Sequence, residues 1–149
     1  MKHYLLIKSD CVSAAGARMS ARESAMALIN KGYWPLWEHT RNRRAIAAGD
    51  KIAIYLSGTG GSEVIATATV DMIAQWNTAF ARGYPLVLDG TPFAVLLLAK
   101  VKILVKAVPV KERLARLSFI NQDSPKWGVA FMGGTRAVSA ADFAVLTGA

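Results

Sequence analysis

The sequence predicts an α+β domain in which short helices surround a curved or barrel-like sheet. The expected elements follow the order strand, helix, several strands and then short helices, a pattern typical of this class. Consecutive strands are joined by short turns, which disfavours parallel β-α-β winding. The chain has 149 residues, of which 53% are hydrophobic, so we expect residues 1–149 to form a single domain around one substantial core.

The N-terminal part predicts one strand and one helix. Residues 4–7 are a short apolar run and are expected to form a buried first strand. Residues 19–31 have apolar positions at helical spacing, and Ser20 with Glu23 forms a Ser-x-x-Glu capping box at their start. Gly32 provides the C-terminal stop, so the helix should end there.

The next part predicts an edge element, a short helix and a strand. Residues 33–39 are expected to form an irregular loop or an edge strand, because a proline within them removes a backbone donor. Residues 42–48 predict a short helix, after which Gly49 and Asp50 turn the chain. Residues 51–56 predict a strand that is buried over most of its length, since their alternation is loose.

The middle of the chain predicts a hairpin and a long strand. Residues 57–62 are rich in Gly and Ser and should connect two strands, the second at residues 63–72. Residues 76–82 predict a short helical or irregular segment and residues 84–88 a strand. Residues 93–108 are a long β-rich run.

Three lysines recur in the long run, at positions 100, 102 and 106. Because they have the same parity, they are expected to share one exposed face. They protect a sheet edge and aid solubility in one interpretation, and form a phosphate-binding track in the other. We favour the first interpretation.

The C-terminal part predicts two short helices with an aromatic cluster between them. Residues 110–117 should form a helical turn or two, and residues 127–134 hold aromatic side chains and end in two glycines. Residues 138–146 predict a final helix that opens with Ser139 as N-cap and Asp142 at its third position.

Charge and cysteine content narrow the function classes. Eighteen Lys and Arg against ten Asp and Glu give a net charge of +8, which attracts polyanions such as nucleic acid or serves solubility alone. Cys11 is the only cysteine, which excludes an intrachain disulfide and fits a reducing cytosol. No apolar run approaches the ~20 residues of a membrane span. We therefore expect a cytoplasmic protein without a membrane partner.

The sequence holds no pattern of an enzyme or of a metal site. His3 and His39 lie far apart, with no Cys, Asp or Glu at metal-ligand spacing. Neither a G-x-S-x-G elbow nor a P-loop nor a G-x-G-x-x-G motif occurs. We therefore predict no catalytic residue, no metal and no cofactor.

The stretch from residue 34 to residue 44 favours nucleic-acid binding. Trp34 and Trp37 could each stack on a base, an interaction worth ~1–3 kcal/mol. Asn42 can donate to and accept from a base edge, while Arg43 and Arg44 suit phosphates. In the alternative interpretation, slightly favoured by spacing alone, the tryptophans fill the core and the arginines form a solvated face.

The chain resembles the EVE domains of the PUA-like superfamily in three ordered stretches that span nearly its whole length. YLLIKSD at residues 4–10 is similar to their Y-W-L-x-K-S-E opening, although Asp10 stands where Glu is common and Cys11 where Pro is usual. The closing LSFINQDSPKWGVAFMGGTRAVSAADFAVL resembles their L-x-F-I…W…F-x-G…R…DF-x-x-L pattern. The middle W…RN…A-x-x-x-GD-x-x-x-x-Y-x-S signature is matched by Trp34 or Trp37, Arg41, Asn42, Ala45, Gly49, Asp50, Tyr55 and Ser57.

The resemblance implies a PUA-like pseudo-barrel of five to six mostly antiparallel strands with surrounding short helices. It also implies a non-catalytic domain that captures a base, often a modified one, of DNA or RNA at the barrel mouth. Carried over by position, the nucleobase-binding residues are Ser9, Trp34, Trp37, Asn42, Tyr55, Ser57 and Trp127. The phosphate-binding residues are Arg41, Arg43 and Arg44.

Some assignments stay open at this point. We favour Trp34 as the stacking ring, because Trp37 follows Pro35 and Leu36 toward the expected core. Trp127 is explained equally well by packing under the final helix. Two other functions remain: a small enzyme acting on RNA or a free nucleotide, which would depend on residues such as Lys8 or Asp10, and a plain protein-interaction domain.

Overall fold

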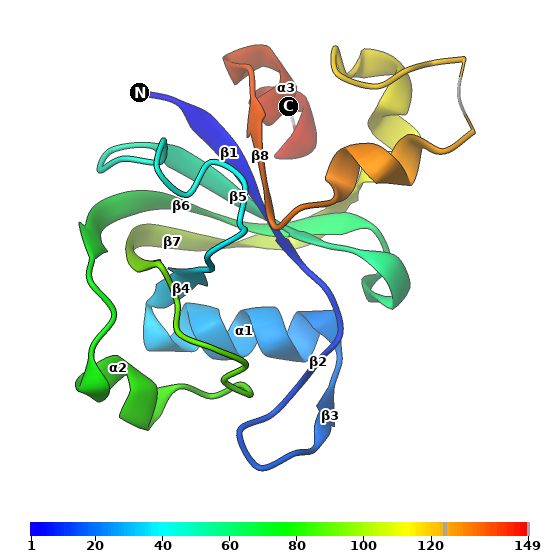
Figure 1. Cartoon of the computed structure of the whole chain (residues 1–149). Coiled ribbons are helices and arrows are strands. Elements are labelled where there is room, and N and C mark those ends of the chain that lie inside the picture. Colours follow the sequence, from blue (N-terminus) through cyan, green and yellow to red (C-terminus); the bar gives the residue numbers. More distant parts are fainter. Residues whose placement is uncertain (124, 149) are drawn as a thin grey trace.

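The computed structural model, which describes residues 1–123 and 125–148, contains a six-stranded sheet that curls into a half-barrel (Figure 1). The strand order is β4-β7-β6-β5-β1-β8, and all neighbours are antiparallel except β1 and β5. The strands are β1 His3–Lys8, β4 Tyr33–Leu36, β5 Lys51–Leu56, β6 Glu63–Ala74, β7 Ala94–Pro109 and β8 Thr135–Val138. The expected α+β pseudo-barrel of five to six mostly antiparallel strands is confirmed.

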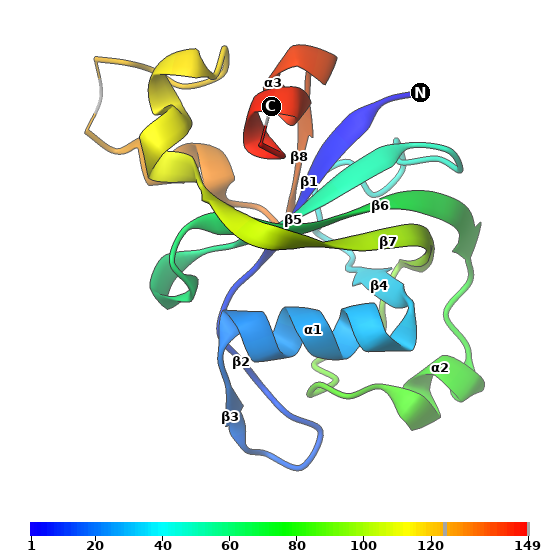
Figure 2. The same cartoon turned by 180° about the vertical axis from the view of Figure 1, so that it is seen from behind.

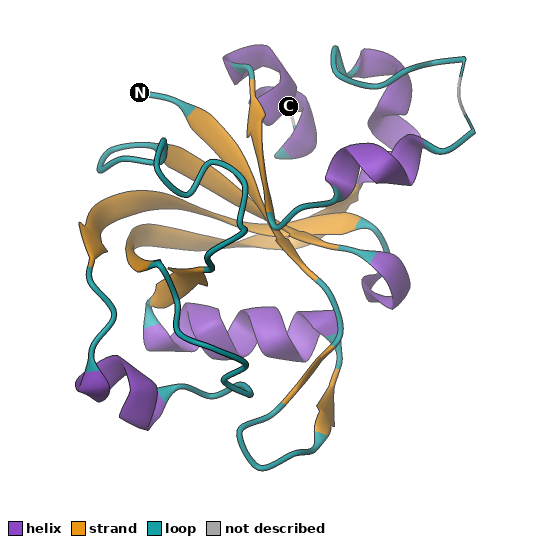
Figure 3. Ribbon diagram, in the orientation of Figure 1, coloured by secondary structure: helices purple, strands orange, loops and turns teal. Residues whose placement is uncertain are grey.

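Short helices lie on both faces of this sheet, as Figure 3 shows. The α-helix α1 (Ala21–Lys31) covers one face, and α3 (Ala140–Leu146) lies over the other (Figures 1 and 2). The remaining elements are the hairpin β2 Cys11–Val12 and β3 Arg18–Met19, the helix α2 Thr78–Gly83, and the 3-10 helices η1 Gly58–Gly60, η2 Val110–Arg116 and η3 Trp127–Phe131. No helix in the described ranges is long and apolar enough to span a bilayer.

The strand β5 is buried on both sides, which explains its loose alternation in the sequence. Ile54 and Leu56 belong to the core cluster beneath α1, while Ala53 and Tyr55 belong to a second cluster with Phe131 near α3. Side chains of successive strand residues point to opposite faces, so an apolar strand in this position supplies both cores. The expectation that residues 51–56 form a mostly buried strand is confirmed.

The predicted start and stop of α1 are confirmed. The Ser20 hydroxyl accepts a hydrogen bond from the Glu23 backbone N–H at 3.0 Å, and the Glu23 carboxylate accepts one from Ser20 N–H at 3.3 Å. Gly32 follows with a φ of 77°, a conformation that glycine adopts without a Cβ clash. Ser139 likewise caps α3 by accepting from the Asp142 N–H at 3.0 Å.

Three predictions need correction. Residues 42–48 form turns and not a helix, because Asn42 adopts a φ of 61° and bonds to a distant part of the chain. Residues 84–88 form no strand, and only Leu86 pairs, through an isolated bridge to Ser13. The sheet also contains one parallel pair, β1 with β5, since α1 and β4 together make the crossover between them.

The lysines of β7 are all exposed, but bulges break their common parity. Thr69 pairs with Ala99 whereas Thr67 pairs with Lys102, so Lys100 and its neighbour occupy one bulge. A second register shift lies between residue 103 and residue 108, where Lys106 is found. Even numbering alone therefore cannot establish that the three side chains share a face.

Candidate functional site

The candidate site lies where β1 and β5 end side by side and the chain enters β8 (Figure 1). Parallel pairing of Lys8 with Leu56 makes Ser9 and Ser57 neighbours at this edge. Ser57 N–H donates to the carbonyl of Lys8 at 2.9 Å, and the Ser57 hydroxyl also donates to it at 3.3 Å. Ile7 N–H donates to the Gly134 carbonyl at 2.8 Å, which fixes the glycine pair before β8 against β1.

Two cavities open at this edge, and Ser9 lines both of them. The inner cavity has a volume of about 170 Å³, with Trp34, Trp37 and Tyr84 as aromatic walls. Its polar lining comes from Lys8, Ser9, Thr40 and Thr135. The outer cavity, about 640 Å³, is lined among others by Ser9, Tyr55, Ser57, Trp127 and Phe131. Six of the seven residues expected at a base therefore line one cavity or the other.

The two tryptophans of β4 and its continuation differ in exposure. Trp34 is only 5% exposed and belongs to the core beneath α1. Trp37 is half-buried, and it also lines a third cavity, of about 430 Å³, beside His39 and Gly133. Its ring meets Tyr84 edge-on, with centroids 6.4 Å apart. Trp37, which the sequence placed toward the core, is thus the ring with more free surface.

The aromatic rings of the outer cavity largely contact one another. Tyr55 stacks on Phe131 with centroids 4.7 Å apart, and Trp127 meets Phe131 edge-on at 5.9 Å. Burial raises the pKa of Tyr55, whose hydroxyl hydrogen-bonds with Ser62 and stays protonated. Tyr55 is therefore a packed wall, while Trp127 remains half-buried with part of its ring free.

Asn42 lines none of the cavities described and holds a turn in place. Its side-chain amide donates to the Thr135 hydroxyl at 3.1 Å, and that hydroxyl donates to the Arg41 carbonyl. A positive φ of 61° is tolerated by Asn better than by most residues. The structure thus ties the turn after Thr40 to the first residue of β8 through Asn42.

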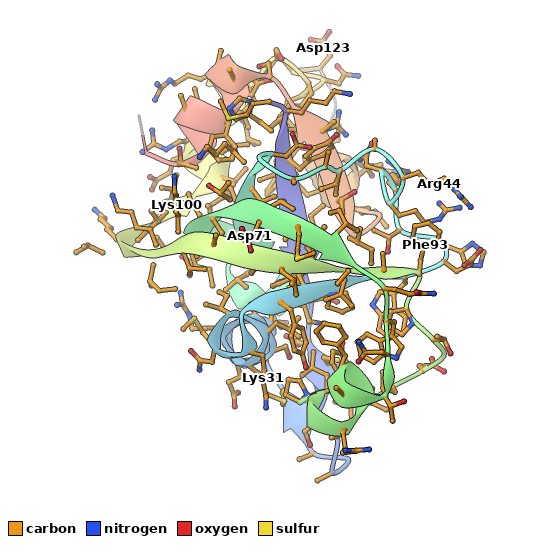
Figure 4. The ribbon with its side chains drawn as sticks, turned by 90° about the vertical axis from the view of Figure 1, so that its left-hand side faces the viewer. Lys31, Arg44, Asp71, Phe93, Lys100 and Asp123 are labelled. Atoms are coloured by element: carbon orange, nitrogen blue, oxygen red, sulfur yellow. The ribbon has the colours of Figure 1, made fainter. Side chains whose placement is uncertain are left out.

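The arginines after Thr40 point in different directions. The guanidinium groups of Arg43 and Arg44 lie over the Phe93 ring, 5.7 and 4.9 Å from its centroid, and Figure 4 shows Arg44 beside Phe93. Arg43 also donates to the Thr40 carbonyl at 3.3 Å. Arg41 instead crosses Gly133, where an added Cβ would lie 2.8 Å from its Nε. Only Arg41 of the three therefore reaches the side of the outer cavity.

Arg41 shares a further cavity, about 450 Å³, with Arg136 and Trp127. Burial lowers the pKa of Arg136, and the nearby charge of Arg41 lowers it further, while Asp142 opposes both effects. Arg136 stays charged, because an arginine guanidinium does not lose its proton in proteins. It is held over the Phe119 ring at 4.3 Å and donates to the Ala130 carbonyl at 3.1 Å. Sequence reasoning missed Arg136, whose only signal was the arginine in the closing pattern.

Lys8 and Asp10 have different environments. Asp10 accepts from the Thr59 hydroxyl at 2.6 Å and from the Ala21 N–H at 2.9 Å, and these bonds lower its pKa. Its carboxylate thereby fixes the start of α1 to the turn after β5. The Lys8 ammonium makes no hydrogen bond or ion pair within the described part of the chain, and Lys8 lines the inner cavity.

No cluster of three or more His, Cys, Asp or Glu that could hold a metal occurs among residues 1–123 and 125–148. The groups that line the cavities of the candidate site are aromatic rings, hydroxyls and cationic side chains.

Comparison with known proteins shows likeness to solved structures. No family model matches the chain, and no curated protein matches it. Protein Atu2648 from Agrobacterium tumefaciens superposes with a TM-score of 0.58 at 15% identity, covering 99% of this chain and 91% of that one. Protein PSPTO5229 from Pseudomonas syringae gives 0.55 at 16% identity, with 95% of each chain covered. Human THYN1, in complex with 5-methylcytosine-containing DNA, gives 0.55 at 12% identity, covering 96% of this chain and 94% of that one.

This chain has the fold of these three proteins, a PUA-like pseudo-barrel. The fold that the sequence resemblance implied is confirmed by these likenesses, which extend over nearly the whole chain. At such low identities the matches establish the fold, while the roles of individual residues rest on the geometry of this chain.

Proposed function

We propose that this chain is a nucleic-acid-binding domain that captures a single base of DNA or RNA, preferentially a modified one. The observation that carries the proposal is the inner cavity. There the half-buried Trp37, Lys8, Ser9 and Thr40 line one small space. A base extruded from its stack is held by such a combination of an aromatic face and polar groups.

In this proposal Trp37 provides the stacking surface and the polar groups contact the base edge. The Thr40 hydroxyl oxygen already accepts from the backbone N–H of Trp37 at 2.9 Å, so the hydroxyl proton is available to an acceptor on the base. The Lys8 ammonium donates to a base carbonyl, and Ser9 can donate or accept. Trp34 forms the buried floor of the cavity.

The outer cavity receives the neighbouring nucleotide, with Trp127 as a second stacking surface. Its phosphate binds between Arg41 and Arg136, two cations whose mutual repulsion a phosphate relieves. Arg43 and Arg44 contribute long-range attraction, because their guanidinium groups lie against Phe93. Asn42 and Tyr55 position these groups without contacting the base.

A modified base is favoured because much of the inner wall is apolar. Ile7, Leu28 and Leu36 line the inner cavity, and a methyl group is better accommodated there than in water. The similarity of fold to human THYN1, whose structure holds 5-methylcytosine-containing DNA, makes 5-methylcytosine the first probe.

Binding of matched oligonucleotides tests the proposal. Fluorescence anisotropy at two salt concentrations would compare a duplex that carries one 5-methylcytosine, an identical unmodified duplex, and single strands of DNA and RNA. We expect binding that weakens with salt and, for one of these substrates, a preference for the modified base of about tenfold, or ~1.4 kcal/mol. Absence of any salt-dependent binding would refute the proposal and favour a protein-interaction domain.

A further inference from the structure

A second basic cleft lies away from the candidate base site. It has a volume of about 330 Å³ and opens between β6, β7 and α3. Lys51, at the first residue of β5, lines it, whereas Ser57 follows the last residue of that strand. Lys100, which also lines it, lies on the opposite side of the molecule from Arg44 (Figure 4). We call this site the lysine cleft; its lining residues are Lys51, Thr67, Ala68, Thr69, Lys100, Lys102, Leu104, Phe143 and Thr147.

The pairing of the strands places the cations on one face of the sheet. Lys51 is opposite Thr69 on β6, and Lys102 is opposite Thr67. Residues that are directly opposite each other in neighbouring strands share a face, as do residues two apart in one strand. Lys51, Thr69, Thr67 and Lys102 therefore project into the same space.

The bulge in β7 is what brings Lys102 there. With regular pairing from Thr69 and Ala99, Thr67 would meet Val101, and Lys102 would point to the other face. The bulge inserts one residue, and Lys100 within it adopts a φ of 51°. A left-handed conformation is unfavourable for a lysine, because its Cβ crowds the following carbonyl oxygen. The strand thus departs from regular geometry at the point where it supplies two cations to the cleft.

Among residues 1–123 and 125–148, no carboxylate pairs with the three ammonium groups of the lysine cleft. Lys51 donates one hydrogen bond, to the Thr69 hydroxyl at 2.8 Å, and keeps two N–H groups for another acceptor. The ion pair between Arg22 and Glu63 lies elsewhere. Phe143, packed against His3 with ring centroids 4.9 Å apart, forms an apolar wall of the cleft. The Thr69 hydroxyl accepts from Lys51 and keeps its own proton to donate. Clustered cations beside hydroxyl donors are the groups that bind a phosphate.

We propose that the lysine cleft binds a phosphate group. Lys51, Lys100 and Lys102 contact its oxygens, and the hydroxyls of Thr67 and Thr69 donate to it. Lys51 and Ser57 lie six residues apart along β5, a span of about 20 Å that separates the cleft from the base site. The lysine cleft shares no lining residue with the cavity of Arg41 and Arg136, so the phosphate proposed there is a different one. The inference does not depend on the proposed base capture. The phosphate belongs either to a nucleic-acid backbone or to a small phosphorylated molecule.

Titration with inorganic phosphate tests the site directly. Backbone amide signals from 15N-labelled protein would be followed as phosphate is added at constant ionic strength, with sodium chloride as the reference. We expect saturable shifts at Thr67, Thr69 and Lys102, and binding at least about fivefold weaker in the Lys51→Gln and Lys102→Gln double variant. The matched control is Lys106→Gln with Lys111→Gln, two exposed lysines outside the cleft, which removes the same charge.

Equal weakening by both double variants, or shifts that never saturate, would overturn the inference. The melting temperature of each variant shows whether it is folded.

A second experiment, oligonucleotide binding by the same variants, identifies the source of the phosphate. If the cleft variant weakens binding of an unmodified oligonucleotide more than the control does, the phosphate is that of a backbone. If oligonucleotide binding is unchanged while phosphate or pyrophosphate binding is lost, a small phosphorylated molecule is the ligand. Both double variants should still prefer the modified base as the unchanged protein does, which distinguishes an effect at the lysine cleft from one at the base site.

Discussion

Two neighbouring tryptophans, Trp34 and Trp37, differ more in role than their sequence spacing suggests. Trp34 is 5% exposed in the core, whereas Trp37 lies between two cavities. We expect Trp34→Ala to lower the free energy of unfolding by about 3–5 kcal/mol, as for other buried aromatic residues. We expect Trp37→Ala to cost less stability and to weaken oligonucleotide binding by ~1–3 kcal/mol, the value of base stacking.

Chemical denaturation and anisotropy on the same two variants separate packing from binding. Trp76→Phe is the control, since that half-buried ring stacks on Phe80, packs against the core beneath α1 and lines none of the described cavities of the site. If Trp37→Ala binds as the unchanged protein does, the assignment of the stacking ring fails.

The Asp142 carboxyl makes the stability of the folded protein change with pH in the acidic range. Burial raises the pKa of its carboxyl, but bonds from the Ser118 hydroxyl at 2.5 Å and the Ser118 N–H at 2.9 Å outweigh it, and the pKa is lowered overall. A lowered pKa in the folded protein gives stability that is present above the ordinary value of about 3.9 and is lost as the pH falls through the folded value.

We therefore expect Asp142→Asn to lower the free energy of unfolding by ~1–3 kcal/mol at neutral pH, the usual effect of disrupting a buried hydrogen-bonded group. The loss should shrink as the pH falls below about 4 and through the lowered pKa of the folded carboxyl, where the carboxylate becomes protonated. Urea denaturation between neutral and acidic pH measures both, with the exposed Asp71→Asn as control. A constant difference across the pH range would contradict the role of the carboxylate.

At the scale of elements, the Gly133-Gly134 segment before β8 supports Arg41. Gly133 has a φ of 93°, and a Cβ there would lie 2.8 Å from Arg41 Nε and 2.9 Å from its Cδ. Gly49 has a nearly equal φ of 91° with nothing within 4 Å, so it is a matched control. Both alanine variants should lose a similar stability of roughly 1–2 kcal/mol from the left-handed backbone.

Only Gly133→Ala should also weaken oligonucleotide binding, because the added methyl displaces the Arg41 side chain from beside Arg136. Anisotropy and melting temperature on both variants distinguish strain from displacement. Equal binding by the two would show that the position of Arg41 does not matter.

The sequence predicted the elements that depend on neighbouring residues, but not those that depend on contacts with distant parts of the chain. The capping box of α1, its stop at Gly32 and the strands β1 and β5 depend on neighbouring residues, and they are confirmed. Residues 42–48 predicted a short helix, but Asn42 bonds to Thr135, 93 residues away, and a turn results. The bulges of β7 arise from its pairing with β6, which periodicity in one strand cannot reveal.

The candidate site shows the same division. Ser9 and Ser57 are brought together by the parallel pairing of β1 with β5, so their adjacency follows once the fold is known. Arg41 points in a different direction from Arg43 and Arg44 because it lies against Gly133 while they lie over Phe93, and both of these residues are distant in the sequence. Arg136 became recognisable only when the structure placed it beside Arg41.

For the whole molecule, the net charge of +8 makes salt the most informative variable. Each phosphate contact contributes about −0.9 to the slope of log K against log salt for duplex DNA, and about −0.7 for single strands. We expect Arg41→Gln with Arg136→Gln to reduce the steepness of the slope by about one contact. Arg43→Gln with Arg44→Gln removes equal charge over Phe93 and should change the slope less.

Salt titration of the two double variants by anisotropy would measure these slopes. A larger change of slope for the Arg43 and Arg44 variant would show that these arginines, and not Arg41 with Arg136, bind the phosphate. The sequence resemblance originally placed it there.

The central claim is that a base enters the inner cavity and stacks on Trp37. The four tryptophans of the chain each give an indole N–H signal in a 15N-labelled protein, so one NMR titration with the oligonucleotide that binds tightest reports on all of them. We predict the largest shift at Trp37, a smaller one at Trp127, and the smallest at Trp76, which lines neither the inner nor the outer cavity. Formation of the complex with the Trp37 signal unmoved would contradict base capture at this site.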